Sequence, residues 1–394
     1  MVDIKNLNIG ILHNSYLKQG GEDAVARNEY QLLVAHHLKV HFLNFKNPEG
    51  TLNQFFTFIN FFFNLYSFIK CYSWLRRNKI KVLHVHNWFF TASPSILWAA
   101  KLLKVTVFVT LHNYRMICPS ATLTHNGKPF LNSMSNSFSW QAIKMGVYRN
   151  SSLLTFNLVF SNWLHHKLGT WQLAKKYITL TDHTKTVFEN SYLKALTTKF
   201  VTKPNFTPAP KSTNQPRADD HFLFVGRLSV DKGVEVLLSA FQCSEHKLTI
   251  IGEGPLQQMV AQFARTHKNI TYLGFQSKEV VEQELNKCTA LLFPSIWYET
   301  FGLVMIEAFA TSTPVIAGNY SSASLIVQHG YNGLHYENGN AMKLKQTLDN
   351  WMAFDTAKRN RYRQNAYQTY LQKYTAKQNF DQLMDIYQSG LADD

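Results

Sequence analysis

The chain has 394 residues, which is long for one hydrophobic core and suits two domains of roughly 200 residues each. Its net charge of +15 is unevenly spread: residues 1–206 hold 23 Lys and Arg against 7 Asp and Glu, whereas residues 207–394 hold 17 against 18. This segregation excludes a general solubility effect. It predicts an anionic partner for the first half, either lipid head groups or nucleic acid.

The cysteines indicate a reducing compartment. Neither C-x-x-C spacing nor a zinc-type histidine pairing occurs around Cys71, Cys118, Cys243 and Cys288. Residues 1–14 contain one short strand-like run and no small-residue cleavage site, so no signal peptide is expected. We therefore expect a cytoplasmic protein, peripheral on the cytoplasmic membrane face if its basic half meets lipid.

The chain opens with a strand, a turn and a helix. The apolar pattern predicts the strand over Asn8–His13, the turn over Tyr16–Gly21 and the helix over Ala24–Leu38. Gly20 and Gly21 allow a tight turn, and the pair fits an ordinary turn as well as a ligand loop.

An aromatic-rich segment follows at residues 51–77. Polar residues recur there at helical steps and predict one polar stripe on a single helix: Thr57, Asn60, Asn64 and Ser67. The charge-free run 55–69 would reach about 22 Å at 1.5 Å per residue, short of the roughly 30 Å hydrocarbon core, so no span is expected. Two interpretations stay open: a helix buried against the sheet, or one lying in an anionic membrane surface with the cations from Lys70 onward.

The next elements are the strand Val82–His86, the helix Ser93–Leu103 and the strand Thr106–Leu111. His84 and His86 alternate on one strand face, but no carboxylate or cysteine stands near with ligand spacing, so no metal site is predicted. His112 leaves the carboxyl end of the last strand, where a histidine is a structural cap about as often as a functional group.

Residues 138–177 are predicted to form one or two helices, in which aromatic side chains are interleaved with Lys and Arg. This composition suits a membrane surface, single-stranded nucleic acid, or a solvated and partly packed helix pair. Residues 207–220, with three prolines, have the composition of a linker between two halves.

The second half restarts with the strand Phe222–Val225 and a glycine-bounded loop. Gly226 allows close backbone approach, while Arg227 and Lys232 offer a planar fork of donors and a point charge, a pair that suits a diphosphate. Two surface cations on a polar loop are the plainer alternative. A second strand, Leu248–Ile251, precedes Gly252, Glu253 and Gly254, a turn type that is common in α/β proteins.

The most informative stretch follows the strand Ala290–Phe293. A helix is expected to open at Leu303, so the backbone N–H groups of Phe301, Gly302 and Leu303 suit phosphate or sugar oxygens. Glu299 stands on the loop and Glu307 in the first helical turn. The two carboxylates either accept hydrogen bonds from sugar hydroxyls or are acids favoured by the helix dipole. The strands Thr313–Ala317 and Leu334–Tyr336 and helices over Ala341–Tyr387 complete the chain.

Taken together, these turns resemble those of retaining glycosyltransferases of the GT-B fold, family 4, over nearly the whole chain. Glu299 and Glu307 match that family's Glu-x7-Glu motif, and Arg227 and Lys232 match its Gly-Arg and Lys-Gly signature. The resemblance implies an α/β protein with two Rossmann-like parallel-sheet domains facing a cleft. Residues 1–206 would be the acceptor domain, 207–370 the donor domain, and 371–394 a helix that crosses back.

The resemblance also implies roles for particular residues. The catalytic group would be His112, Arg227, Lys232 and Glu299. The donor-binding group would be Gly20, Gly21, Gly226, Gly252, Glu253, Gly254, Phe301, Gly302, Leu303 and Glu307. Ser312 stands where relatives usually have glycine, and the expected Pro-Glu before Ile326 is missing, which leaves the preferred sugar and base open.

The implied reaction moves a hexose from a UDP- or GDP-sugar to a saccharide or lipid-linked acceptor, in cell-surface polysaccharide biosynthesis. The chain has no Asp-x-Asp triplet, so we expect no metal and no cofactor beyond the co-substrate, and no nucleic-acid partner is expected. The alternatives are a nucleotide-sugar epimerase or phosphorylase of the same fold, and a non-enzymatic lipid- or nucleic-acid-binding protein with a degenerate sugar site.

Overall fold

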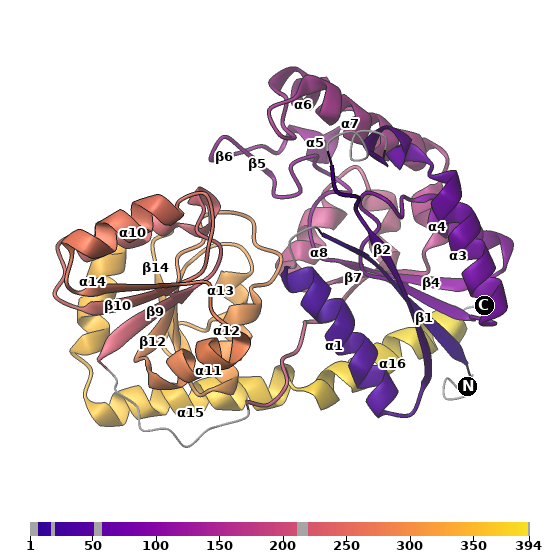
Figure 1. Ribbon diagram of the computed structural model, residues 1–394. Helices are drawn as coiled ribbons and strands as arrows, with labels where there is room; N and C mark the ends of the chain where they lie inside the picture. Colours follow the sequence, from indigo (N-terminus) through magenta and orange to yellow (C-terminus); the bar gives the residue numbers. More distant parts are fainter. Residues whose placement is uncertain (1–6, 17–19, 51–56, 211–219, 393–394) are drawn as a thin grey trace. The chain divides into compact units, whose positions relative to one another are not determined.

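The computed structural model describes residues 7–16, 20–50, 57–210 and 220–392. The chain divides into two compact units. Unit 1 runs to Pro204 and resumes at Asn379, and unit 2 comprises Asn205–Gln378. Each unit contains a six-stranded parallel sheet with helices on both faces (Figure 1).

The strands of unit 1 lie in the order β2 (Lys39–Lys46), β1 (Asn8–Ser15), β3 (Val82–Val85), β4 (Thr106–Leu111), β7 (Lys176–Thr179) and β8 (Phe200–Thr202). From β1 the chain adds β2 on one side, and β3, β4, β7 and β8 follow on the other. The strand order therefore reverses between β1 and β3. In open parallel sheets, ligands bind at the carboxyl ends of the strands at such a reversal.

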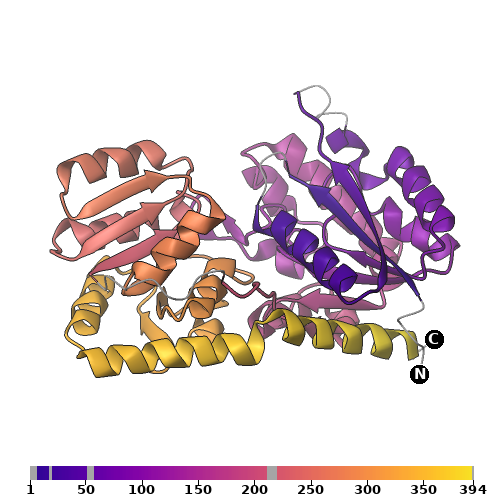
Figure 2. The ribbon, with the colours of Figure 1, turned by 60° about the horizontal axis from the view of Figure 1, so that its bottom comes forward.

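Alternation along β1 assigns the helices of unit 1 to two faces. Ile9 and Ile11 pack with Leu383 of α16 (Ala376–Ala392), which lies along unit 1 in Figure 2. Gly10 points the other way, where a Cβ atom would stand 2.6 Å from Trp74 of α3 (Leu65–Arg77). The other helices of the unit are α1 (Gly21–Ala35), α4 (Ser95–Leu102), α5 (Asn132–Ser135), α6 (Trp140–Met145), α7 (Ser152–Lys167) and α8 (Asp182–Glu189). Three 3₁₀ turns, η2 (Asn60–Phe62), η3 (Thr170–Leu173) and η4 (Lys194–Lys199), and a hairpin of β5 (Thr124–His125) and β6 (Lys128–Pro129) complete the described part of unit 1.

The prediction of one helix over residues 51–77 is wrong for the part that the structure describes. Asn64 caps α3 by accepting a hydrogen bond from the Ser67 N–H at 3.0 Å, so the helix starts at Leu65. Ser67 is buried, and its hydroxyl donates to the Thr91 carbonyl at 2.6 Å. The polar residues therefore end one segment and anchor the next. Residues 51–56, and residues 17–19 of the predicted first turn, lie outside the described residues.

The helical prediction for residues 138–177 fails at its end. The segment holds α6 and α7, but its last two residues belong to β7, which pairs with β4. The predicted linker also begins as packed structure: Thr207 is buried, and its N–H donates to the Tyr374 carbonyl at 3.2 Å. Residues 211–219 of that stretch lie outside the described residues.

The strands of unit 2 lie in the order β11 (Ile270–Gly274), β10 (Lys247–Ile251), β9 (His221–Val225), β12 (Ala290–Phe293), β13 (Val315–Gly318) and β14 (Gly333–Tyr336). The order reverses between β9 and β12. One face packs on three helices, α9 (Val234–Gln242), α10 (Gln257–Thr266) and α14 (Ala341–Met352), through a cluster that includes Phe222, Phe241 and Trp351. The unit also contains α11 (Lys278–Lys287), α12 (Leu303–Ala310), α13 (Ala323–Ile326), α15 (Thr356–Lys373) and η5 (Val230–Lys232).

The described residues contain neither a membrane-spanning helix nor a disulfide. None of the helices placed there combines enough length with enough apolar character to cross a bilayer. All four cysteines fall within the described ranges, and none of them forms a disulfide.

Candidate functional site

Two loops meet where the strand order of the second sheet reverses. One follows β9 and includes Arg227 and Lys232, and the other follows β12 and includes Glu299. The Asp231 carbonyl accepts from the Ile296 N–H at 3.0 Å and from the Ser295 hydroxyl at 3.2 Å, so the loops are bonded to each other. The fold therefore brings these predicted residues to the place where α/β sheets bind ligands.

Lys232 and Glu299 form an ion pair across these loops. The same carboxylate oxygen, Oε1, accepts from the Ser295 hydroxyl at 2.8 Å and from the Trp297 indole N–H at 3.1 Å. The Lys232 ammonium also lies 5.4 Å from the centroid of the Trp297 ring. The sequence did not predict a role for Ser295 or Trp297, although both stand in the loop between the strand Ala290–Phe293 and Glu299.

The pair sets the charge of the Glu299 carboxyl. Burial acts to raise the pKa of the Glu299 carboxyl, but the Lys232 charge and the hydrogen bonds described above outweigh it, so the pKa is lowered. Glu299 is therefore ionised at neutral pH and holds the ammonium in place. Arg227 is exposed, and no ion pair joins it to any residue in the described part of the chain.

The turn after β10 is pressed against the loop after β9. The Leu228 N–H donates to the Glu253 carbonyl at 2.9 Å. A Cβ atom on Gly252 would stand 1.9 Å from the Gly226 carbonyl oxygen, and one on Gly254 would stand 2.3 Å from that of Leu228. Both glycines are therefore required by close backbone approach, while the Glu253 side chain is exposed.

Gly302 precedes α12 in a left-handed conformation, with φ of 101°. A Cβ atom there would meet Phe293 at 2.9 Å and Met305 at 2.7 Å. Phe301 is buried, with its ring centroid 6.0 Å from that of Tyr374. Leu303 begins the helix, as predicted, and the N–H groups of a first helical turn have no partner within the helix.

Glu307 differs from its prediction. It is the fifth residue of α12, so the first turn contains no acid and the helix-dipole explanation does not apply to it. Burial raises the pKa of its carboxyl; Lys278 lowers it in part, and Glu282 raises it further. Within the described residues no ion pair joins Glu307 to Arg227 or Lys232, so the structure does not pair the two carboxylates with the same cation.

In unit 1, His112 lies beside His86 at the ends of neighbouring strands. The two rings stack with centroids 5.3 Å apart, and His86 Nδ1 is 3.1 Å from His112 Nε2. Burial lowers the pKa of His86 to about 4 and holds that of His112 well below its usual value. Both imidazoles are therefore neutral at physiological pH, and one donates to the other.

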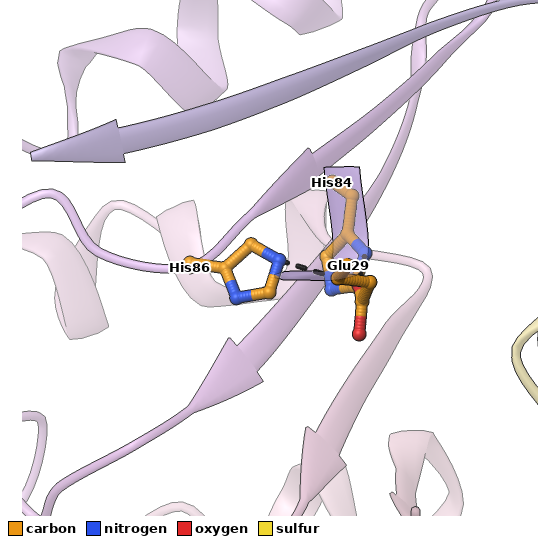
Figure 3. A group of neighbouring side chains, drawn as sticks. All are labelled: Glu29, His84 and His86. Carbon is orange, nitrogen blue, oxygen red and sulfur yellow. Dashed lines mark ion pairs between the residues drawn. The ribbon is translucent and has the colours of Figure 1, made fainter. Parts of the chain in front are cut away.

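A carboxylate from α1 accompanies the strand histidines, which corrects the argument that none stands near them. Glu29 Oε1 is 2.9 Å from His84 Nδ1 and 3.3 Å from His86 Nε2 (Figure 3). Its other oxygen is 2.9 Å from the buried Lys203 ammonium. The three residues offer ligand atoms within 4.8 Å of one another, as a metal would need. A metal cation would, however, be repelled by Lys203 across the shared carboxylate, so the arrangement fits a buried ion cluster better.

The glycine pair forms the start of α1. The Gly20 N–H donates to Asp23 Oδ2 at 2.8 Å, and Asp23 Oδ1 bonds His13 Nε2 at 3.0 Å. Gly21 is the first residue of the helix. These contacts explain the pair as a capped helix start next to the reversal point of the first sheet.

Residues 205–369 match the family model described as glycosyl transferases group 1. This segment is similar to that family and makes up less than half of the chain. Curated relatives include an uncharacterized glycosyltransferase of Methanocaldococcus jannaschii, 36% identical over 128 residues, and the O-antigen chain mannosyltransferase C of Escherichia coli, 27% identical over 174 residues. These matches cover 32% and 43% of this chain, and only 36% and 46% of the relatives' own lengths.

Solved structures resemble the chain over nearly its full length. A glycosyltransferase from Rickettsia africae has a TM-score of 0.71 at 16% identity and covers 98% of this chain and 99% of its own. Anabaena HepE in complex with UDP and glucose has a TM-score of 0.65 at 18% identity, covering 96% of this chain and 99% of its own. At such identities the likeness shows the fold, which is GT-B, as predicted.

Proposed function

We propose that the chain is a glycosyltransferase that moves a hexose, with retention of configuration, from a UDP- or GDP-sugar to a saccharide or lipid-linked acceptor. The observation that carries the proposal is the Lys232–Glu299 ion pair, with the exposed Arg227 on the same loop, at the strand-order reversal of the group 1 domain. Two cations beside a helix start suit a diphosphate.

Transfer breaks the bond between the anomeric carbon and the diphosphate oxygen, so negative charge grows on the departing diphosphate. Arg227 and Lys232 neutralise that charge, and the N–H groups at the start of α12 bind its oxygens. Glu299 holds Lys232 in position and accepts a hydrogen bond from a sugar hydroxyl. Because these groups are already ordered, the acceleration comes from positioning and electrostatics.

We propose roles for two further residues, Glu307 in unit 2 and His112 in unit 1. Burial raises the pKa of the Glu307 carboxyl, and hydrogen bonds donated by the ribose hydroxyls of the nucleotide would stabilise its ionised form. His112, kept neutral by burial, would hydrogen-bond the transferred sugar, with His86 fixing its ring. The acceptor hydroxyl attacks on the face that the diphosphate leaves, and its proton passes to the departing phosphate oxygen.

The known relatives support the substrate class. They include the O-antigen mannosyltransferase named above and a D-rhamnosyltransferase of Pseudomonas aeruginosa, and the HepE complex contains UDP. O-antigen chains are surface polysaccharides, so we propose a role in cell-surface polysaccharide biosynthesis. The basic first half would then meet the anionic membrane that carries a lipid-linked acceptor.

We also propose that no metal assists the departing diphosphate, because the chain lacks an Asp-x-Asp triplet and supplies two cations of its own. EDTA should leave transfer unchanged. A loss of activity in EDTA that Mg²⁺ or Mn²⁺ restores would contradict the proposal.

The decisive experiment screens UDP- and GDP-hexoses for thermal stabilisation of the chain and then for nucleotide release. Nucleotide release that depends on an added acceptor supports transfer and argues against an epimerase or a phosphorylase. Arg227→Ala with Lys232→Ala should abolish both signals. The matched control, Arg265→Ala with Lys268→Ala on exposed positions of the same unit, should change neither.

A further inference from the structure

Unit 1 exposes apolar side chains on one side of α3. Leu65, Tyr66 and Ile69 are 62%, 64% and 54% exposed. At 100° per residue these positions lie together, opposite the buried Ser67 and Cys71. One side of α3 therefore packs against the core. Its other, apolar side is covered by no other part of the described chain.

A second exposed group stands on α6 and α7. Trp140, Leu153 and Phe156 are 63%, 66% and 40% exposed. The Phe138 ring joins two of them, with centroids 5.0 Å from Trp140 and 6.4 Å from Phe156. The helices are consecutive in the chain and pack on each other. They lie next to each other in Figure 1.

Hydrogen bonds join α7 to the residues that precede α3. Asn157, next to Phe156, donates to the Ile59 carbonyl at 3.5 Å, and His165 of α7 bonds the Phe62 carbonyl of η2. The chain enters α3 three residues after Phe62. We call the two exposed groups together the apolar face and define it by Leu65, Tyr66, Ile69, Trp140, Leu153 and Phe156.

Charge identifies what covers this face. Between Glu49 and Asp182 the sequence has no acidic residue and 14 Lys and Arg. Exposed cations stand on the same elements, with Arg76 and Arg77 at the end of α3 and Lys144 on α6. A second copy of the chain would set like charge against like charge. Single-stranded nucleic acid binds by stacking its bases on aromatic rings, and the aliphatic side chains of Leu65, Ile69 and Leu153 offer no such ring.

We propose that the apolar face docks unit 1 on an anionic lipid surface. The apolar side chains enter the head-group layer, and the surrounding cations meet the lipid phosphates, as in interfacial helices. The inference deepens the proposed membrane-side acceptor and rests on it for its biological purpose. The exposed residues and the absence of acids are independent of the sugar site.

The test is co-sedimentation of the full chain with vesicles of phosphatidylcholine, or of equal parts phosphatidylcholine and phosphatidylglycerol. The face variant carries Leu65→Ser, Tyr66→Ser and Ile69→Ser. The control carries Met259→Ser, Met342→Ser and Leu371→Ser, which replace exposed apolar residues of unit 2. We expect salt-sensitive binding to the anionic vesicles, reduced about tenfold or more in the face variant and unchanged in the control.

A second readout reports insertion directly. Phosphatidylcholine with brominated chains, mixed into the anionic vesicles, should quench part of the tryptophan fluorescence, and Trp140→Phe should remove most of that quenching. The proposal is overturned if the wild-type chain does not bind vesicles, or if the face variant binds equally well. It is also overturned if the face variant only dissolves a dimer, or only loses affinity for single-stranded DNA.

Thermal stabilisation by UDP and GDP, measured on the same samples, separates this proposal from the transferase. Retained nucleotide stabilisation with no vesicle binding refutes the apolar face alone. Vesicle binding without any nucleotide stabilisation refutes the transferase and leaves the face standing.

Discussion

Replacing Lys232 by methionine tests the proposed site most directly. The substitution keeps the length and most of the volume of the side chain but removes its charge. The partner, Glu299, has a side chain that is 12% exposed, against 25% for Lys232. Glu299 would keep its hydrogen bonds from Ser295 and Trp297, so the carboxylate loses a counter-charge without losing every partner.

The expected loss of stability is modest. Two unit charges about 4 Å apart attract by about 4 kcal/mol at an effective dielectric constant near 20. The solvation that both groups give up offsets roughly half of this, and the partial exposure of Lys232 screens it further. We therefore expect the free energy of unfolding to fall by about 1–2 kcal/mol.

The expected loss of catalysis is larger. A preordered charge that meets charge developing in the transition state is worth about 10²–10³ in turnover. The Lys232→Met variant should therefore lose at least about a hundredfold in kcat/KM, while Lys232→Arg should retain most of it. A purely structural ion pair would show the stability loss without the catalytic one.

The assays are urea unfolding and acceptor-dependent nucleotide release. Because the pKa of Glu299 is lowered in the folded state, its contribution to stability is present above the unfolded pKa and lost as pH falls toward the folded one. Without Lys232 the folded pKa rises, so this loss should begin at a higher pH. The reasoning is refuted if Lys232→Met keeps kcat/KM within about twofold of the wild-type chain.

Three further substitutions give separate outcomes. Gly302→Ala should destabilise unit 2 by about 2–4 kcal/mol in urea unfolding, because φ is 101° and the new Cβ would meet Phe293 at 2.9 Å; an unchanged midpoint would contradict this. Glu29→Gln should cost about 3–5 kcal/mol, because the buried Lys203 loses its counter-charge. Burial acts to raise the pKa of Glu29, but Lys203 and the two strand histidines hold it well below its usual value, so the stability that Glu29 contributes to the wild-type chain should be lost as pH falls below about 4.3. The difference in the free energy of unfolding between the wild-type chain and the variant should therefore shrink in acid. Arg227→Ala should leave unfolding unchanged, because the side chain is exposed, and weaken nucleotide-dependent thermal stabilisation at least about tenfold in apparent affinity.

The sequence predicted best those elements whose signal is local. The strands Thr106–Leu111 and Ala290–Phe293 match β4 and β12 residue for residue, because short apolar runs between polar loops form buried strands of a parallel sheet. The edge strand β2 was not predicted. Its half-exposed residues mix polar and apolar types and carry no such signal.

The aromatic segment shows where periodicity misleads. Helical spacing of polar residues over 57–67 also arises when an asparagine ends one turn and caps the next helix, as Asn64 does. Capping cannot be distinguished from a continuous helix by period alone. The fold class, two parallel-sheet domains of GT-B type, survived this error because it rests on the order of many elements.

The sequence also predicted some features of the candidate site and not others. The sequence predicted that Lys232 and Glu299 stand on loops that follow two strands, but not that they form an ion pair. The structure brings them together because the carboxyl ends of adjacent parallel strands share one edge. The contact of Glu29 with His86 could not be predicted, because α1 brings Glu29 from a distant part of the chain and no sequence motif links the two residues. The catalytic and donor-binding roles of the site residues stay predictions until the variants are measured.

The chain leaves unit 1 after Pro204 and re-enters it at Asn379, and these two points are bonded to each other. The Asn379 side-chain amide donates to the Pro204 carbonyl at 2.8 Å, and the Lys203 ammonium donates to Asn379 Oδ1 at 3.1 Å. In the sequence, therefore, unit 2 is inserted within unit 1. Deleting residues 205–378 would leave two ends already side by side, so a few glycines would suffice to rejoin them and make unit 1 as a separate polypeptide.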